Sequence, residues 1–588
     1  MPYRNTSIIG LLIVCAPALC LAQAQARKSE QPSGSPSAEP VPTFRVTSRI
    51  VTLEVIAKDH HGQAVPGLKA SDFQVFEQEL GWRKEKREQK VAFFREVDKQ
   101  VLAQTDKSKV QVPEGIFTNL LSLQKNPVPP TILLVDGLNT ELSAQMQVHA
   151  QMVKMLNSLP SDVPVAVYLM GRGVKVLQGF TTDPTLLKTA LSKAAMPSSV
   201  VASTVDPRDD PDSLSTLMGD MPQISQSTLA AIQSFEQEQY ASSMDWRVRA
   251  TVEALISVAR HVAGYPGRKN LLWISSSFPI VLNADASTFD SFRTYQDDMR
   301  KLAAVLADAK VAVYPIDPAG VSTSRYMQAG SRNRSNARDA LARESQLRFT
   351  QQATMDELAQ QTGGSVCVND NDLGDCVKRA IDDSSAFYEI AYYPDSQDWS
   401  RDFRKIIVKT NRPGVHLAYR QGYFTGEENN KDPKKQDSEL LQAACEDYLN
   451  ATSILFAAKS LPPDSPENLK FYLAIDPTSL TFVPTQDGGE DLKINVAVCT
   501  FDKAGKPLHL MRDPIDRTFS AKEYNTLVAL KGLPHIVSIP GPKPAAVRLL
   551  VKDLASGRVG SINVRVESLE HPPSAEPQSA AQNPTAAH

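Results

Sequence analysis

The sequence has no surplus of basic charge of the kind that nucleic-acid-binding proteins carry. Its 63 Lys and Arg residues are balanced by 66 Asp and Glu residues, which gives a net charge of −3. A nucleic-acid-binding protein is expected to concentrate basic residues on one face. The densest basic run, RKEKREQK at 83–90, also contains acids, so we expect a solvated strand edge or loop there. Nucleic acid is therefore not an expected partner.

Several catalytic and nucleotide-binding motifs are also missing. The sequence contains no G-x-S-x-G, H-E-x-x-H, G-x-x-x-x-G-K-[ST] or G-x-G-x-x-G, which excludes the common hydrolase, zinc-protease and phosphate-loop signatures. WISSSFP at 273–279 places serines at the end of an expected strand, where open parallel sheets carry functional residues. No particular His or acid can be assigned to partner these serines. We expect a protein that is not an enzyme, with a hydrolase that uses Ser275–Ser277 as the alternative.

Long apolar runs are absent after the first residues of the chain. The N-terminus has Arg4, an apolar stretch over 8–21 and alanines at 22, 24 and 26, which is the pattern of a signal peptide over 1–26. Leu19 before Cys20 argues against a lipid anchor, because such signals need a small residue there. No later segment is long and apolar enough for a membrane helix. We expect export to the periplasm, the cell surface or the medium, with no transmembrane segment.

Only six cysteines occur, and two of them lie in the expected signal peptide. The others, Cys367, Cys376, Cys445 and Cys499, permit two disulfides in an oxidising compartment. Cys367 and Cys376 are close in sequence and are therefore the first candidates for a pair, with the alternative that all four are buried free thiols. No histidine lies near them at zinc-site spacing, so zinc is not expected.

The pattern of the remaining chain divides it into several parts. Residues 27–43 are rich in Pro and Ser and predict a flexible linker, and 568–588 predict a disordered tail. Residues 44–98 and 386–424 show strand-like alternation, but neither segment has enough strands for a stable sandwich. We therefore expect the two segments to pair in one β-sandwich, with the middle of the chain inserted between them.

The middle region, 127–385, alternates continuous apolar strands with helical patterns. This alternation predicts a mostly parallel sheet with helices on both faces. Two inserts interrupt it, 196–245 and 319–349, and long loops of this kind are functional or disordered. The second insert is rich in arginine.

Residues 436–567 begin with a helical pattern and continue as strands. The phrases AVCTFDKAGKPL and RLLVKDLASGRV repeat a strand, an Asp and a Gly, as VIAKDHHGQAV does near the N-terminus. Such phrases suit hairpin turns, so we expect a C-terminal β-sandwich-like domain of immunoglobulin (Ig)-like type.

The middle region resembles a von Willebrand factor A (VWA) domain. The residues that carry the resemblance are ILLVD, VAVYLMGRGVKVLQGFTTDPTLLKTAL and TVEALISVARHV followed by GRKNLLWIS. Over 46–424 the chain is similar to the bacterial VWFA-related family described from Acidobacteria, in phrases such as YPGRKNLLWISSSFP and FRKIIVKTNRPGVHLAYRQGYF. The resemblance implies a multidomain α/β plus all-β protein, with a Rossmann-like VWA domain inserted in or next to an Ig-like β-sandwich. It also implies protein–protein recognition or adhesion through loops at the C-terminal edge of the sheet.

VWA domains typically bind a divalent cation through D-x-S-x-S, a later Thr and a later Asp. By this resemblance Asp136 matches the first acid and Thr140 the last hydroxyl, whereas Leu138 falls at the middle hydroxyl. The later Thr falls near Arg249, with Thr251 as a substitute.

The later Asp of the family is replaced by Ser276 or a neighbour. A hard cation such as Mg²⁺ requires oxygen ligands, so the resemblance implies a degenerate metal site. We expect no cofactor, and the alternative is weak binding of Mg²⁺ or Mn²⁺. In that case the protein could act as a metal-dependent accessory factor of a hydrolase.

The expected partner is another protein, whose identity the sequence does not give. It would contact loops at 136–141, 196–245, 249–251 and 275–285. The residues expected to bind it are Asp136, Asn139, Thr140, Arg249 and Ser276. A structural envelope spacer is a further alternative. Without metal, Asn139 or Thr140 would cap the following helix.

Overall fold

A computed structural model of the chain describes residues 50–79, 86–98, 115–119, 129–140, 142–157, 159–192, 213–219, 221, 224–265, 267–275, 289–317, 337–368, 373–394, 403–424, 441, 445–447, 449–465, 468–485 and 487–570. The expected signal peptide, the linker and residues 571–588 of the expected tail lie outside these residues. The described part of the chain is a mixed α/β structure with several sheets, as the sequence predicts.

The middle of the chain forms a five-stranded sheet with the order β10-β9-β6-β7-β8. Its strands are β6 (Thr131–Asp136), β7 (Val165–Met170), β8 (Val174–Thr181), β9 (Lys269–Ile274) and β10 (Val311–Ile316). All neighbours are parallel except β8, which runs antiparallel to β7. The chain proceeds from β6 to β7 and later returns to β9 on the other side of β6. Strand order therefore reverses between β6 and β9, and the carboxyl ends of the strands at such a reversal are the usual ligand-binding position.

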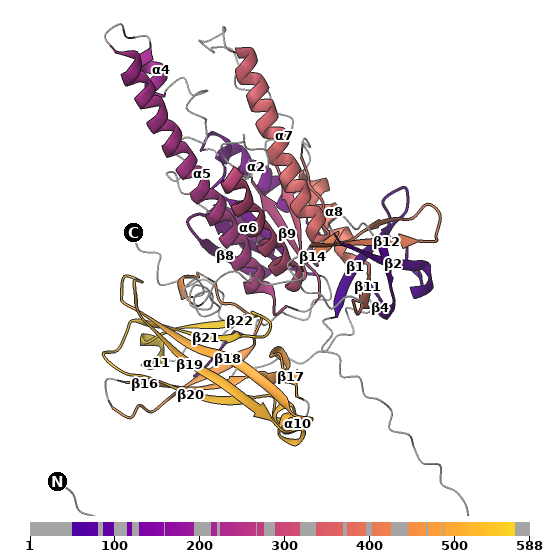
Figure 1. Cartoon of the computed structure of the whole chain (residues 1–588), viewed down its shortest axis with the longest axis vertical. Coiled ribbons are helices and arrows are strands. Elements are labelled where there is room, and N and C mark those ends of the chain that lie inside the picture. Colours follow the sequence, from indigo (N-terminus) through magenta and orange to yellow (C-terminus); the bar gives the residue numbers. More distant parts are fainter. Residues whose placement is uncertain are drawn as a thin grey trace, which may run out of the picture. The chain divides into compact units, whose positions relative to one another are not determined.

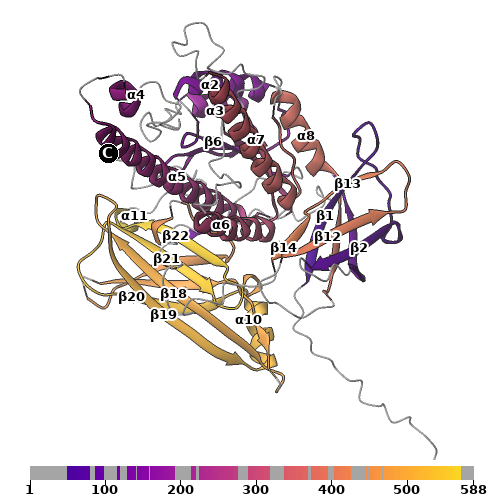
Figure 2. The ribbon, with the colours of Figure 1, turned by 45° about the horizontal axis from the view of Figure 1, so that its top comes forward.

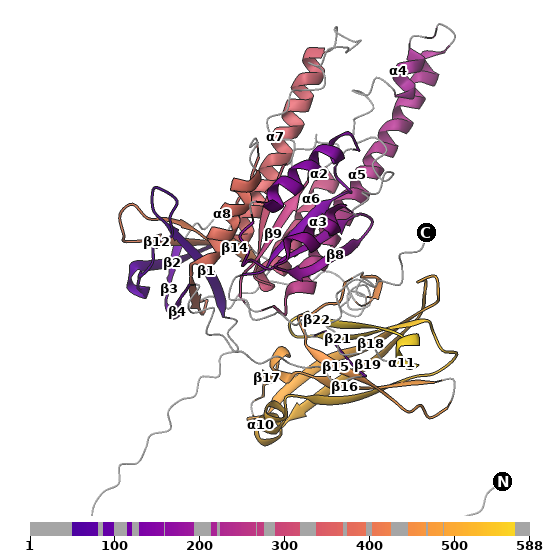
Figure 3. The same cartoon turned by 180° about the vertical axis from the view of Figure 1, so that it is seen from behind.

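Helices cover both faces of this sheet, as Figures 1 and 3 show. One face carries α2 (Leu142–Asn157), α3 (Pro184–Ser192) and α8 (Leu373–Ser385), and the other carries α5 (Gln226–Val262), α6 (Phe289–Asp308) and α7 (Ala337–Thr362). Leu134 and Trp273 pack on the α5 side, whereas Leu133 and Leu272 pack on the α2 side. Every residue of β6, β7, β9 and β10 is buried, because each strand is covered on both faces.

The two inserts are not only loops, which corrects the expectation from the sequence. The first contains α4 (Leu214–Gly219) and the first half of α5, a helix of 37 residues that the Ser225 side chain caps by accepting from the Thr228 amide. The second contains the start of α7. Figures 1 and 3 show that α5 and α7 both extend beyond the sheet. No helix in the described ranges is long and apolar enough to cross a membrane.

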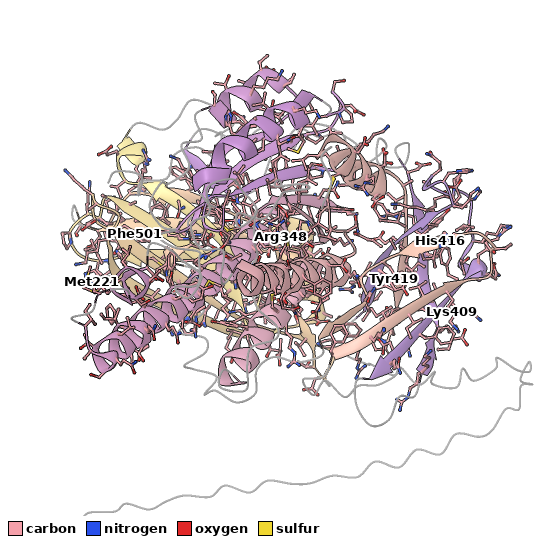
Figure 4. All side chains as sticks on the ribbon, turned by 90° about the horizontal axis from the view of Figure 1, so that it is seen from above. Met221, Arg348, Lys409, His416, Tyr419 and Phe501 are labelled. Atoms are coloured by element: carbon pink, nitrogen blue, oxygen red, sulfur yellow. A yellow bond between two sulfur atoms is a disulfide. The ribbon has the colours of Figure 1, made fainter. Side chains whose placement is uncertain are left out.

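Segments from before and after the parallel sheet form two further four-stranded sheets, β13-β1-β11-β4 and β14-β12-β2-β3. Their strands are β1 (Val51–Lys58), β2 (Phe73–Glu79), β3 (Lys86–Gln89), β4 (Val91–Val97), β11 (Phe387–Tyr392), β12 (Phe403–Thr410), β13 (His416–Ala418) and β14 (Gly422–Phe424). Leu53 pairs with Ile390 and Val75 with Val408, so each sheet contains strands of both segments. Tyr419, labelled in Figure 4, accepts a hydrogen bond from the Val408 amide at 2.9 Å. An Ig-like strand arrangement stays a prediction.

The C-terminal domain contains two sheets, one with the order β20-β16-β15-β5 and one with the order β17-β18-β21-β22, to which β19 adds by pairing with β18 (Figure 2). The strands are β15 (Phe456–Leu461), β16 (Leu469–Ile475), β17 (Val483–Pro484), β18 (Glu490–Phe501), β19 (Pro507–Phe519), β20 (Leu533–Ile539), β21 (Ala546–Asp553) and β22 (Val559–Arg565), and the helices are α10 (Ala521–Leu530) and α11 (Glu567–Glu570). Strand β5 (Ile116–Thr118) precedes the parallel sheet in sequence but pairs with β15. The Asn119 side chain donates to the carbonyls of Ala451 and Ile454. The sequence pattern did not indicate this strand.

Candidate functional site at the carboxyl edge of the parallel sheet

Asp136 is the last residue of β6 and is fully buried at the point where strand order reverses. Its Oδ1 atom accepts hydrogen bonds from the backbone amides of Leu138 at 2.9 Å and Asn139 at 2.8 Å. An Asp side chain that accepts from the backbone two residues on forms a local turn. One oxygen of the carboxylate therefore shapes the loop after β6.

The other oxygen of Asp136 connects this loop to β9. Oδ2 accepts from Asn139 Nδ2 at 2.8 Å, from Trp273 Nε1 at 3.1 Å and from Ser275 Oγ at 2.8 Å. The carboxylate thus accepts five hydrogen bonds, one more than the roughly four lone-pair positions that an ionised carboxylate offers, so the donors saturate both oxygens. Burial raises the pKa of Asp136, while the hydrogen bonds from Asn139, Ser275 and Trp273 oppose that rise.

Asn139 extends the network to α5. Its Nδ2 also donates to Thr251 Oγ1 at 2.8 Å, and its Oδ1 accepts from Arg247 Nε at 3.3 Å and Nη2 at 3.2 Å. Thr251 Oγ1 in turn donates to the Arg247 carbonyl one helical turn earlier. All of these side chains are buried, so the network fixes the β6 loop between β9 and α5.

The structure brings three predicted residues, Asp136, Asn139 and Thr251, into direct contact, but it does not bring Arg249 to them. Arg249 is exposed and pairs with Asp245 at 3.1 Å on the same helix. Arg247 takes the place near the site that we expected for Arg249. The helical spacing of Arg247 and Thr251, four residues apart on the stripe that also contains Val248 and Val252, is the signal that could have identified it.

Of the other predicted residues, the structure describes Thr140 and Ser275. Thr140 is buried next to Asn139, and Ser276 lies outside the described residues. The serine that meets Asp136 is Ser275, which is fully buried. A nucleophilic serine needs a base and access to its substrate, whereas this hydroxyl is engaged with a carboxylate and positions the strand end. Ser277 also lies outside the described residues.

The donor set around Asp136 does not fit a divalent cation. Mg²⁺ requires near-octahedral oxygen ligands at short distance, but both oxygens of this carboxylate already accept hydrogen bonds. Leu138 is fully buried at the position of the middle hydroxyl, and the guanidinium of Arg247 brings a fixed positive charge against Asn139. Elsewhere in the part that the structure describes, no three His, Cys, Asp or Glu side chains are grouped as metal ligands.

Apolar side chains are exposed on α4 and on the first half of α5, which extends beyond the parallel sheet. Leu214, Leu217, Met221 and Phe235, in or next to α4 and in the first half of α5, are 49%, 56%, 50% and 58% exposed. Glu236 of α5 holds α4 in place by accepting from the Leu214 amide at 2.7 Å. Figure 4 labels Met221 in this region. We call α4 together with Met221 and residues 224–245 the α4–α5 projection.

The four cysteines beyond the expected signal peptide form two disulfides. Cys367 pairs with Cys376, with Cα atoms 6.1 Å apart, and Cys445 pairs with Cys499, at 5.9 Å. The first pair connects the segment beside β10 to α8, since Cys367 forms a parallel bridge with Ile316. The second lies in the C-terminal domain.

Comparisons with known proteins give only remote similarities. No family model matches the chain, and no curated protein matches it. An aerotolerance-related membrane protein from Bacteroides fragilis NCTC 9343 is 10% identical over 43% of this chain and 98% of its own, with a TM-score of 0.22. The conserved hypothetical protein BatB from Bacteroides thetaiotaomicron is 11% identical over 43% and 97%, with a TM-score of 0.22. A von Willebrand factor type A protein from Catenulispora acidiphila is 10% identical over 58% and 82%, with a TM-score of 0.20.

At these TM-scores the similarities carry no argument about fold or function. The structural neighbours of the chain include a VWA protein and BatB, at low identity and partial coverage. The narrower resemblance to the VWFA-related family stays a prediction.

Proposed function

We propose that the chain is an exported, non-catalytic VWA-type protein that recognises another protein at the carboxyl edge of its parallel sheet, without a bridging metal ion. The buried network of Asp136 supports this proposal, because its carboxylate is used to fix the loop after β6. Asp136, Asn139 and Thr140 are themselves buried, so in this proposal they support the binding surface instead of contacting the partner, which corrects the expectation that they bind it directly. The network holds β6, β9 and α5 together, and a rigid support of this kind lowers the entropy cost of binding.

The observation that carries the proposal is the exposed apolar surface of the α4–α5 projection. Leu217 and Phe235 are more than half exposed, and both lie in the segment 196–245 that the sequence indicates as a contact region. Grouped exposed apolar side chains mark interaction sites on soluble proteins. A few residues contribute most of the binding energy at an interface, and large apolar side chains gain free energy when a partner removes them from water. The proposed partner therefore contacts the projection with an apolar patch of its own.

Capture of a partner by the full chain tests the proposal. Immobilised protein is incubated with increasing amounts of an envelope extract of the host cells, and the bound proteins are identified and quantified. We expect saturable capture of a discrete protein that is lost in the double variant Leu217→Ala, Phe235→Ala. EDTA should leave capture unchanged, because the site is proposed to work without metal.

The matched control is Leu530→Ala on α10, which removes a 74% exposed apolar side chain far along the chain from the projection. This variant should capture the partner as the wild type does. Capture that persists in the double variant, or that requires Mg²⁺, contradicts the proposal. Absence of any saturable capture favours the envelope spacer.

A further inference from the structure

The disulfide between Cys367 and Cys376 lies directly beneath an arginine. Nη2 of Arg379 is 3.4 Å from the sulfur of Cys376 and 3.9 Å from that of Cys367. Cys367 is 6% and Cys376 5% exposed, whereas Arg379 is exposed. Its Nε donates to the Asp375 carbonyl at 3.4 Å, which holds the side chain over the sulfurs. One exposed side chain therefore lies over a disulfide close to the surface.

Arg379 would stabilise a thiolate at Cys376 by its positive charge, and the position of Cys376 in α8 would stabilise it further. Cys376 is the fourth residue of this 13-residue helix, which begins at Leu373. Unpaired amides and the helix dipole favour negative charge near a helix N-terminus. Cysteines near helix N-termini and next to Arg are the ones whose thiolates are stabilised.

The second disulfide has a different environment. Cys499 lies opposite Arg548 in the pairing of β18 and β21. The guanidinium of Arg548, however, donates to the carbonyls of Asp447 and Leu449 and to Ser561 Oγ. This pair therefore serves as an internal reference for the first.

We propose that Cys367–Cys376 is a thiol–disulfide exchange site, which a dithiol reductant opens while Cys445–Cys499 stays closed. Arg379 and the start of α8 stabilise the thiolate that reduction releases. A disulfide whose reduced form is stabilised is a stronger oxidant and is reduced more readily.

The exchange proceeds in two steps that balance. A thiolate of the dithiol attacks Cys367 sulfur, the S–S bond breaks, and Cys376 leaves as the thiolate beside Arg379. Cys376 is the leaving group because the better-stabilised thiolate leaves faster. The second thiol of the reductant then attacks the mixed disulfide and releases Cys367, which takes up a proton. The dithiol is oxidised by two electrons to its disulfide, and its other proton goes to solvent.

Redox titration of the full chain tests the proposal. The protein is equilibrated in dithiothreitol buffers of graded potential, quenched with acid and alkylated, and each cysteine pair is quantified by peptide mass spectrometry. We expect Cys367–Cys376 to be reduced at a less negative potential than Cys445–Cys499. Arg379→Gln should change the equilibrium constant of the first pair about tenfold toward the disulfide, which is about 30 mV. The second pair should not move.

Two variants of α8 separate the contact from the charge of the helix. Lys378→Gln removes one positive charge from the neighbouring exposed position and should leave both midpoints unchanged. Arg379→Lys keeps the charge and should retain most of the effect. Equal midpoints for wild type and Arg379→Gln would overturn the proposal, as would reduction of the second pair before the first.

The direction of attack has its own readout. Glutathione has a single thiol, so it forms a mixed disulfide that acid quenching traps. We expect the glutathione adduct on Cys367. An adduct predominantly on Cys376 would contradict the assigned leaving group and with it the role of Arg379.

Discussion

At the scale of single residues, Asp136 organises the carboxyl edge of the sheet. It is buried and accepts from two backbone amides and three side chains. The carboxylate stabilises the fold because it is the acceptor for buried donors. Without it, each buried donor would lack a partner and would cost the full desolvation free energy of that group.

Replacement of this acid should therefore destabilise the protein strongly. For Asp136→Ala we expect a loss of about 3–5 kcal/mol in the free energy of unfolding, because Trp273 Nε1, Ser275 Oγ and Asn139 Nδ2 lose a buried acceptor. Urea unfolding followed by tryptophan fluorescence measures it. The control is Asp183→Ala, which removes an exposed acceptor of the Thr185 amide at the start of α3 and should cost about 1 kcal/mol. Similar losses for both variants would show that the Asp136 network contributes little.

A second buried residue makes stability depend on pH. His261, near the end of α5, is 5% exposed, and its Nδ1 lies 2.7 Å from the Asn450 carbonyl. Its ring is 5.9 Å from that of Tyr168, and the charged groups that act on it are Asp447 and Arg548. Burial lowers the pKa of His261 below its ordinary value of 6.5, although the Asn450 carbonyl opposes this shift.

Acidification should therefore destabilise the protein through His261. Because the folded pKa is lower than the unfolded one, the unfolded state binds the proton first, so stability present above pH 6.5 is lost as the pH falls through the folded pKa. One proton changes the free energy of unfolding by at most about 1.4 kcal/mol per pH unit. We expect His261→Gln to remove this slope in urea titrations between pH 7.5 and 4.5. His416→Gln, at an exposed position, should retain it, and equal slopes in all three proteins would exclude His261 as the cause.

At the scale of elements, α5 has two halves with different environments. Its second half packs on the sheet through residues such as Val252 and Leu255. In its first half Leu229, Ile232, Tyr240 and Met244 are only half-buried. Helix propensity and the Ser225 cap stabilise this half in place of a core. The α4–α5 projection therefore depends on local contacts. The main one is the hydrogen bond that the Leu214 amide of α4 donates to the Glu236 carboxylate.

Removal of this contact should loosen α4 without unfolding the sheet. In Glu236→Ala the amides of Leu214 and Ser215 lose their acceptor. We expect α4 amides to exchange about fivefold faster, which corresponds to a loss of about 1 kcal/mol of capping energy. Hydrogen exchange with mass spectrometry measures this rate. Glu238→Ala, at an exposed position on the same helix, should leave it unchanged, whereas an unchanged rate in Glu236→Ala would mean that α4 is held by other contacts.

At the scale of the whole molecule, function is proposed to be independent of metal. A ligand at a hundred times its dissociation constant adds about 2.7 kcal/mol to the free energy of unfolding. We expect thermal unfolding of the full chain to be the same in EDTA and in millimolar Mg²⁺, Mn²⁺ or Ca²⁺, since the Asp136 oxygens are occupied. A rise in the unfolding temperature that Asp136→Ala abolishes would show that the site still binds a cation.

The assembly of the molecule brings distant segments together. Residues 51–55 pair with residues of β11 more than 300 positions later, and 116–118 join a sheet whose other strands follow residue 455. The number of strands in each segment predicted that 44–98 and 386–424 pair, but local patterns do not predict which strand lies beside which, because many strands of similar alternation compete for the same edge. The short β5 has no alternation long enough to indicate a strand at all.

The sequence by itself determined the features that depend on local burial patterns. The continuous apolar runs at 131–136 and 311–316 coincide with β6 and β10, because a strand covered on both faces needs apolar residues throughout. Only the tertiary structure decided which side chains meet. A helix turns by about 100° per residue, so positions 247 and 249 point in nearly opposite directions, and packing on the sheet selected Arg247 for the network and left Arg249 to solvent. The same packing turned both oxygens of Asp136 toward hydrogen-bond donors. No local pattern encodes the whole network, because Trp273 and Ser275 lie at the end of β9 and Thr251 and Arg247 lie on α5.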